Sequence, residues 1–122
     1  MIASNRRRRA QVRAMVRESR AHGRAVRNVA TGAPQTAKTH LIAVGIDTAT
    51  ATRFAPAFSR SVIATGTTTG QIKLTRKSRN TKTVSIKLYD LATFVARLAV
   101  YRPAKDKAAA ATFATAAHAM AA

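Results

Sequence analysis

Residues 6–27 read RRRRAQVRAMVRESRAHGRAVR, and the spacing of the arginines in this stretch predicts a helix. Seven of them follow one another at intervals of three or four residues. On a helical wheel with about 100° per residue, these seven fall within a sector of about 80°. We call them the stripe arginines: Arg6, Arg9, Arg13, Arg17, Arg20, Arg24 and Arg27. Valines, alanines and Met15 occupy the opposite side, so residues 1–30 are expected to form one long, amphipathic helical arm.

The stripe arginines are a predicted binding surface for phosphate groups. At about 1.5 Å per residue, they span about 32 Å of helix. A planar guanidinium donates two parallel hydrogen bonds to phosphate oxygens, which a lysine ammonium cannot do. The stripe therefore predicts a surface that contacts the phosphate backbone of DNA or RNA electrostatically, with little sequence specificity.

Two other interpretations of the stripe remain open. It could be the solvated face of a helix that is buried by its other side, although such faces usually mix charges of both signs and Glu18 is the only acid in residues 1–30. It could also bind an anionic membrane. Helices of that kind usually carry Trp, Phe or Leu on the apolar face, whereas this one has Val, Met and Ala. A membrane is therefore not the expected partner.

The overall charge supports a polyanionic partner. The chain has 122 residues, enough for one small domain and an arm, and its 22 Lys and Arg face four acids, which gives a formal net charge of +18. A small domain with that charge repels itself, and a bound polyanion relieves the repulsion.

Composition also excludes several classes of protein. There is no cysteine, so disulfides and thiolate metal sites are excluded. No apolar run approaches the length of a membrane span or of a secretory signal, so an intracellular location or the inside of a virus particle is expected. The Arg-rich, acid-poor start is also typical of a mitochondrial presequence, although we expect it to be retained.

The sequence divides into four regions and predicts an α+β fold. These are the arginine-rich arm (1–30), a linker containing Gly32 and Pro34 (31–37), a small α+β domain (38–103), and an alanine-rich C-terminal helix (104–122). The expected fold has the long basic N-terminal helix, a small antiparallel sheet with a basic hairpin at about 71–89, and two C-terminal helices.

Strands are predicted for much of residues 38–90, which are rich in Thr, Val and Ile. Residues 41–44 are a candidate strand, and residues 48–52 suit an extended segment, although a helix is also open there. Residues 66–70 read as the loop of a first hairpin. A second hairpin is clearer, because residues 72–75 and 84–88 alternate apolar and polar side chains around the polar turn 77–81.

Two helices are predicted after the sheet. Asp90 is expected to cap a helix from Leu91 to Arg102 that Pro103 ends. The last helix, from about Ala104 to Met120, is interpreted as docked or partner-bound rather than as independent core. The predicted core includes all four phenylalanines, and two tyrosines are expected to be exposed enough to stack on bases. These are Phe54, Phe58, Phe94 and Phe113, and Tyr89 and Tyr101.

The predicted hairpin carries a second basic cluster. A basic hairpin can lie along a nucleic-acid groove or enter folded RNA. Alternatively, its lysines protect the sheet edge from pairing with other chains. Four further cations, Arg97, Arg102, Lys105 and Lys107, could extend this surface. The hairpin cations are Lys73, Arg76, Lys77, Arg79, Lys82 and Lys87.

No pattern of catalytic residues is present. His22, His40 and His118 lack the spacing of metal ligands, the four acids are scattered, and there is no GxxxxGK[ST] loop. We therefore expect no enzyme activity, no cofactor and no metal. The expected function is nucleic-acid binding with an architectural or packaging role beside other proteins of a nucleoprotein assembly, such as a virion. A ribosomal or other ribonucleoprotein component is the alternative, and DNA or RNA is left open.

Overall fold

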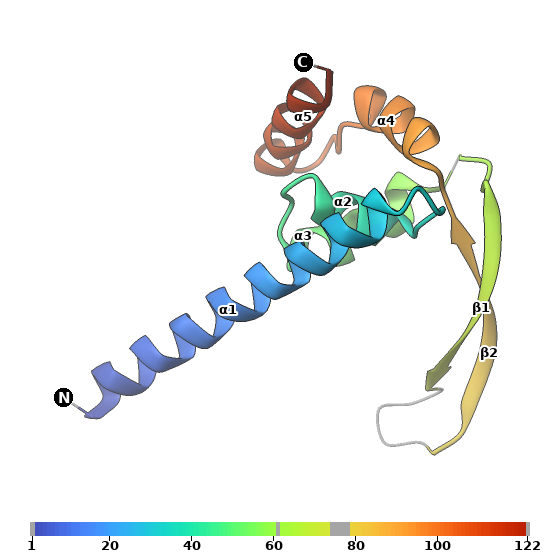
Figure 1. The fold of residues 1–122 in the computed structure, drawn as a ribbon. Coiled ribbons are helices and arrows are strands. Elements are labelled where there is room, and N and C mark those ends of the chain that lie inside the picture. Colours follow the sequence, from blue (N-terminus) through green and yellow to red (C-terminus); the bar gives the residue numbers. More distant parts are fainter. Residues whose placement is uncertain (1, 61, 74–78, 122) are drawn as a thin grey trace.

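The structure is a computed structural model that describes residues 2–60, 62–73 and 79–121. Within these ranges the fold is α+β, as predicted. Along the chain, three helices precede one antiparallel hairpin and two helices follow it (Figure 1). The elements are α1 (Ile2–Ala30), α2 (Ala37–Ala43), α3 (Thr48–Phe58), β1 (Gly66–Lys73), β2 (Thr81–Leu88), α4 (Leu91–Val100) and α5 (Lys107–Ala121).

Helix α1 confirms the predicted long basic helix, and its buried and half-buried residues all lie in its last third. Every residue from Ala3 to Arg20 is exposed, whereas Ala25 is buried and Val29 is half-buried against the body of the protein. The N-terminal part of α1 therefore projects from the body of the protein as an arm (Figure 1).

The candidate strand at residues 41–44 is wrong, because residues 41–43 belong to α2, and residues 48–52 adopt the helix that the sequence left open as the alternative to an extended segment. Thr36 caps α2 by accepting a hydrogen bond from the backbone N–H of Thr39, and Asp47 caps α3 through that of Thr50. The intrinsic strand preference of Thr, Val and Ile is weak, and packing overrides it. Helical spacing here buries one apolar face, formed by Leu41, Ile42, Ala51, Phe54 and Phe58.

The hairpin is longer than predicted on its first strand. β1 pairs antiparallel with β2 from Gly66↔Leu88 to Lys73↔Thr81. The predicted hairpin loop at 66–70 is therefore wrong, and these residues form strand. A Cβ on Gly70 would meet the end of the Ile86 side chain, which would have to shift to make room for it. Residues 77 and 78 of the predicted turn 77–81 lie outside the described residues, and its last residue, Thr81, begins β2.

The core lies between α2, α3, α4 and α5. Phe94, Phe113, Leu41 and Leu98 are fully buried, and the Phe58 ring lies 5.4 Å from Phe94, centroid to centroid. The predicted phenylalanine core is confirmed. α5 is docked, as predicted, but Phe113 also makes it part of the core, contrary to the interpretation of this helix as outside it.

Two boundaries and two tyrosines also differ from the predictions. Asp90 caps α4 as predicted, but the helix ends at Val100, before Pro103. α5 begins at Lys107 because Asp106 accepts a hydrogen bond from the N–H of Ala109 at its start. Tyr89 is only 4% exposed and Tyr101 is half-buried, so the prediction of exposed, base-stacking tyrosines is wrong. Tyr89 instead pairs with Gln35 in an isolated bridge at the base of the hairpin.

Candidate nucleic-acid interface

All seven stripe arginines are exposed in the structure. The ion pair found among the described residues joins Arg53 to Asp106, so none of the stripe arginines is neutralised within that part of the chain. The stripe runs along the projecting arm and continues onto the docked part of α1, where Arg24 and Arg27 lie. The helix therefore presents one uninterrupted row of positive charge to solvent.

The acid of α1 is turned away from this row. Glu18 Oε2 accepts hydrogen bonds from the backbone N–H and the hydroxyl of Thr48, both at 3.2 Å. One turn later, His22 Nδ1 donates to the carbonyl of Ile42 at 2.9 Å. These two residues and Ala25 mark the docking side of α1, which lies about 150° around the helix axis from the stripe. Docking of α1 thus uses its acid on the body and leaves the stripe purely cationic.

The exposed apolar side chains of the arm are few. Val12, Met15 and Val16 are 52%, 71% and 40% exposed. They form a short band beside the stripe without an aromatic or leucine side chain. Within the described residues, no helix combines the length and apolar character that crossing a bilayer requires.

A depression joins the stripe to α2 and α3. It is lined by Arg24 and Asn28 of α1, Lys38 and Thr39 of α2, and Thr48 of α3. Next to it, a second depression is lined by Lys38 again, together with residues of α3 and β2. These residues are Pro56, Ser59, Ser85 and Lys87. Lys38 therefore connects the stripe to the base of the hairpin across the surface of α2 and α3.

The hairpin cations do not gather on one face. Lys87 lies opposite Thr67 and Lys82 opposite Ile72 in the register, an odd separation that puts these two lysines on opposite faces of the hairpin. Both are exposed, as is Arg79, two residues before the start of β2. Lys73 ends β1, with only its backbone described, and Arg76 and Lys77 lie outside the described residues.

The arginines after the hairpin have structural contacts. Arg97 Nε donates to the carbonyl of Phe58 at 2.8 Å, and its guanidinium lies over the Tyr101 ring. Arg102 donates to the carbonyl of Leu98 at 2.9 Å, near the C-terminal end of α4. Their contacts hold α4 to α3 and close the end of α4. Lys105 and Lys107 are exposed at the start of α5.

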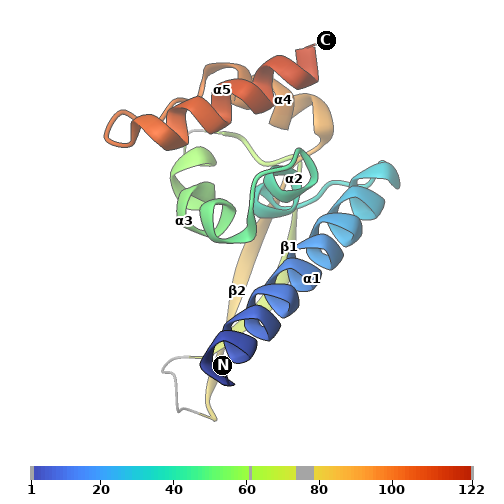
Figure 2. The same cartoon turned by 90° about the vertical axis from the view of Figure 1, so that its left-hand side faces the viewer.

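The two basic elements, α1 and the hairpin, project from the same side of the helical body. Figure 1 shows them diverging below α2 and α3, and the view in Figure 2, turned by 90°, shows both again extending downward. α4 and α5 lie at the other side of the body in both views. The positive charge of α1 and the lysines of β2 thus border one side of the molecule.

Sequence reasoning missed Lys38 and the exposed face of α3 because residues 38–58 were interpreted as extended. Two local signals could have found the helices. Thr36 and Asp47 each stand three residues before a Thr whose N–H they cap, and Ala51, Phe54 and Phe58 recur at helical spacing.

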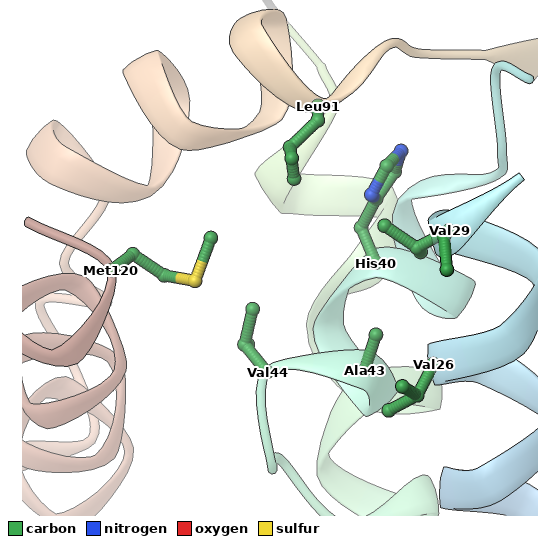
Figure 3. A pocket seen from close by; sticks show the side chains of 8 residues that line it. Val26, Val29, His40, Ala43, Val44, Leu91 and Met120 are labelled. Atoms are coloured by element: carbon green, nitrogen blue, oxygen red, sulfur yellow. The ribbon is translucent and has the colours of Figure 1, made fainter. Parts of the chain in front are cut away.

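An apolar pocket of about 270 Å³ lies between α1, α2, α4 and α5 (Figure 3). Val26, Val44, Leu91 and Met120 give it aliphatic walls, and His40 supplies its ring. His40 Nε2 lies 2.7 Å from the carbonyl of Tyr89, to which it donates, and the ring stacks on Phe94. Burial lowers the pKa of His40, so the ring is neutral near pH 7. The pocket therefore offers no positive charge to an anion.

No group of three or more His, Asp or Glu side chains that could hold a metal ion occurs within the described ranges. Asp47 and Asp90 are helix caps, and their hydrogen bonds from Thr50 and Thr93 lower the pKa of each carboxyl. No protein-family model matches the chain, and no curated protein or solved structure gives a significant match to it. The site is therefore interpreted from its own residues.

Proposed function

We propose that this chain is a non-enzymatic nucleic-acid-binding protein that grips the phosphate backbone electrostatically and serves an architectural or packaging role within a nucleoprotein assembly such as a virion. One observation carries the proposal: α1 projects from the body with seven exposed arginines in a row, while Glu18, its acid, is bound to Thr48 on the body.

The length and chemistry of the row suit a polyanion. Arginines three or four residues apart follow one another at about 5 Å along the helix, so the row presents positive charge to a polyanion at short, regular intervals. Each guanidinium can donate two hydrogen bonds to one phosphate, and each contact releases counterions from the nucleic acid. A solvated surface has no physical need for seven unpaired charges of one sign, because such charges repel one another along a helix.

The membrane alternative has weaker support. The apolar band of Val12, Met15 and Val16 is small, and binding to a bilayer depends on the apolar area that enters it. The alternative role in a ribosomal or other ribonucleoprotein particle draws on the same stripe and on the hairpin.

The test compares two pairs of charge reversals on the same helix. The first pair, Arg13→Glu and Arg17→Glu, lies on the stripe, and the matched pair, Arg7→Glu and Arg8→Glu, lies off it with the same change in charge. Filter binding to DNA and RNA oligonucleotides is expected to weaken by at least about tenfold more in the stripe pair than in the matched pair. Retention of wild-type affinity by the stripe pair would refute the stripe as the binding surface.

Vesicle binding tests the membrane alternative. Co-sedimentation with vesicles that contain anionic lipid, at the same salt concentration, is expected to be weaker than binding to nucleic acid. Vesicle binding that exceeds nucleic-acid binding, with the same loss in the stripe pair, would replace the proposal with the membrane alternative.

A further inference from the structure

Helices α2 and α3 are joined by a short turn of a distinctive kind. Four residues, 44–47, separate the end of α2 from the start of α3. Gly45 has a φ of +102° in this turn, a conformation that glycine adopts without strain, and the following Ile46 is buried. A turn of three or four residues with a glycine is the connection found in the helix-turn-helix unit, which in DNA-binding proteins places its second helix in the major groove.

The second helix has one buried and one open face. Ala51, Phe54 and Phe58 hold α3 on the core. On the opposite side Ala49, Thr52 and Pro56 are exposed. Small side chains on this face allow the backbone of a helix to come close to base edges, and threonine can contact bases of either kind by hydrogen bonds or through its methyl group.

Cations lie near both ends of α3. Thr48, at the start of α3, lines a depression with Arg17, Arg20 and Arg24 of the stripe and with Glu18. Toward the end of α3, Pro56 and Ser59 line a depression with Lys38 and Lys87. A helix in a major groove is flanked by phosphate backbones, which these cations can contact.

The hairpin completes the pattern. β1 and β2 follow α3 in the chain and project from the body on the same side as the arm (Figures 1 and 2). The bridge between Gln35, just before α2, and Tyr89, just after β2, ties the base of the hairpin to the start of α2. The chain order is therefore a helix, the α2–α3 pair and a hairpin, and a basic hairpin beside such a pair can lie along a groove of the nucleic acid.

We infer that the partner of this surface is double-stranded DNA, with α3 in the major groove, the stripe of α1 along one phosphate backbone and the hairpin as a wing on the other side. The inference rests on the proposed function and names its substrate class. B-form DNA has a major groove about 12 Å wide that admits a helix, whereas the major groove of A-form RNA is too narrow. Single strands are disfavoured because Tyr89 is buried and Tyr101 half-buried, leaving neither ring free to stack on bases.

The first experiment measures affinities for a 30-base-pair DNA duplex, the RNA duplex of the same sequence and the single DNA strand at about 150 mM salt. Binding to the DNA duplex is expected to be at least about tenfold tighter than to either of the others. Thr52→Glu is expected to weaken duplex DNA binding by at least about tenfold. The same substitution at Thr112, an exposed position on α5, is the matched control and is expected to change it by less than about twofold.

Site-directed crosslinking keeps the inference testable if Thr52→Glu fails to fold. The chain has no cysteine, so Thr52→Cys and Thr112→Cys each accept one photo-crosslinker. Crosslinks to duplex DNA are expected from position 52 and not from position 112.

Equal affinity for the DNA and RNA duplexes, or an absence of crosslinks from position 52 while reversal of Arg13 and Arg17 still abolishes binding, would overturn the helix-turn-helix inference and leave the proposed function standing. If the wild-type chain binds none of the three nucleic acids, the proposed function fails and the inference fails with it.

Discussion

Glu18 of α1 and Thr48 of α3 are joined by two hydrogen bonds, one from the backbone N–H and one from the hydroxyl of Thr48, each 3.2 Å from Oε2. Thr48 is the first residue of α3, where the N–H groups have no partner within the helix. The carboxylate supplies such a partner and is attracted by the positive end of the helix. The same contact anchors α1 where the arm leaves the body.

Removal of the Glu18 carboxylate should therefore loosen the arm. Glu18→Ala is expected to lower the free energy of unfolding by about 0.5–1.5 kcal/mol, measured by urea denaturation at low salt. Ser19→Ala, at the exposed neighbouring position, is the control and should stay within about 0.5 kcal/mol of wild type. Equal stabilities of the Glu18→Ala and Ser19→Ala proteins would contradict the anchoring role.

The salt dependence of binding should count the stripe arginines that contact phosphate. If all seven do, the slope of log K against log salt concentration on duplex DNA is about −6. Arg13→Gln with Arg17→Gln should make the slope less negative by about 2, because each lost contact removes about 0.9. Arg7→Gln with Arg8→Gln, off the stripe, should leave it unchanged. Identical slopes for the two pairs would mean that net charge, not the stripe, sets the affinity.

The arm should exchange its amide protons faster than the docked end of the same helix. The stripe arginines are like charges three or four residues apart, which weakens a helix, and residues 3–20 have no tertiary burial to offset this. Hydrogen exchange is expected to be fast at residues 6–16 and slow at 22–29 in the free protein. Bound oligonucleotide should slow exchange at residues 6–16. An exchange rate there that does not change when the oligonucleotide is added would argue against folding of the arm on its partner.

The burial of His40 should make stability depend on pH. Burial lowers the pKa of the ring below its ordinary value of 6.5, while the bond to the Tyr89 carbonyl and the nearby Asp90 carboxylate act in the opposite direction. The unfolded chain then binds a proton at a higher pH than the folded chain. The free energy of unfolding therefore has its full value above about pH 6.5 and decreases as the pH is lowered from there, until the pH is below the folded-state pKa.

Urea unfolding between pH 5 and pH 8 checks this expectation. His40→Phe preserves an aromatic ring against Phe94 and removes the titrating group, so its stability should decline less over the same range. A wild-type stability that is flat between pH 7 and pH 5 would be inconsistent with a histidine buried in its neutral form.

Much of the fold could be predicted from local patterns. The stripe marks α1 because charge recurs at the helical period, and alternation of apolar and polar residues marks β2. Asp90 was identifiable as a cap because its carboxylate follows a strand and precedes an apolar helical run. Each of these signals lies within one element and depends on backbone geometry alone.

Residues 37–58 show where local patterns fail. Their Thr, Val and Ile content favours strands by a preference spanning only about 1 kcal/mol. Burial of Leu41, Phe54 and Phe58 outweighs it, since a large apolar side chain contributes about 1.5–3 kcal/mol when it is buried. The aromatic partners of Phe58 and Phe54, which are Phe94 and Phe113, lie 36 and 59 positions further along the chain, beyond any local window.

The sequence alone thus determined the charged arm, the hairpin and the helical C-terminal part, because periodicity and capping act between neighbours in the chain. The tertiary structure alone decided that α2 and α3 are helices, that Tyr89 is buried, and that Glu18 faces the body. The tertiary structure also placed the exposed face of α3 between the stripe and Lys87. Those outcomes depend on which apolar faces can be buried together, and that becomes defined only when distant elements pack.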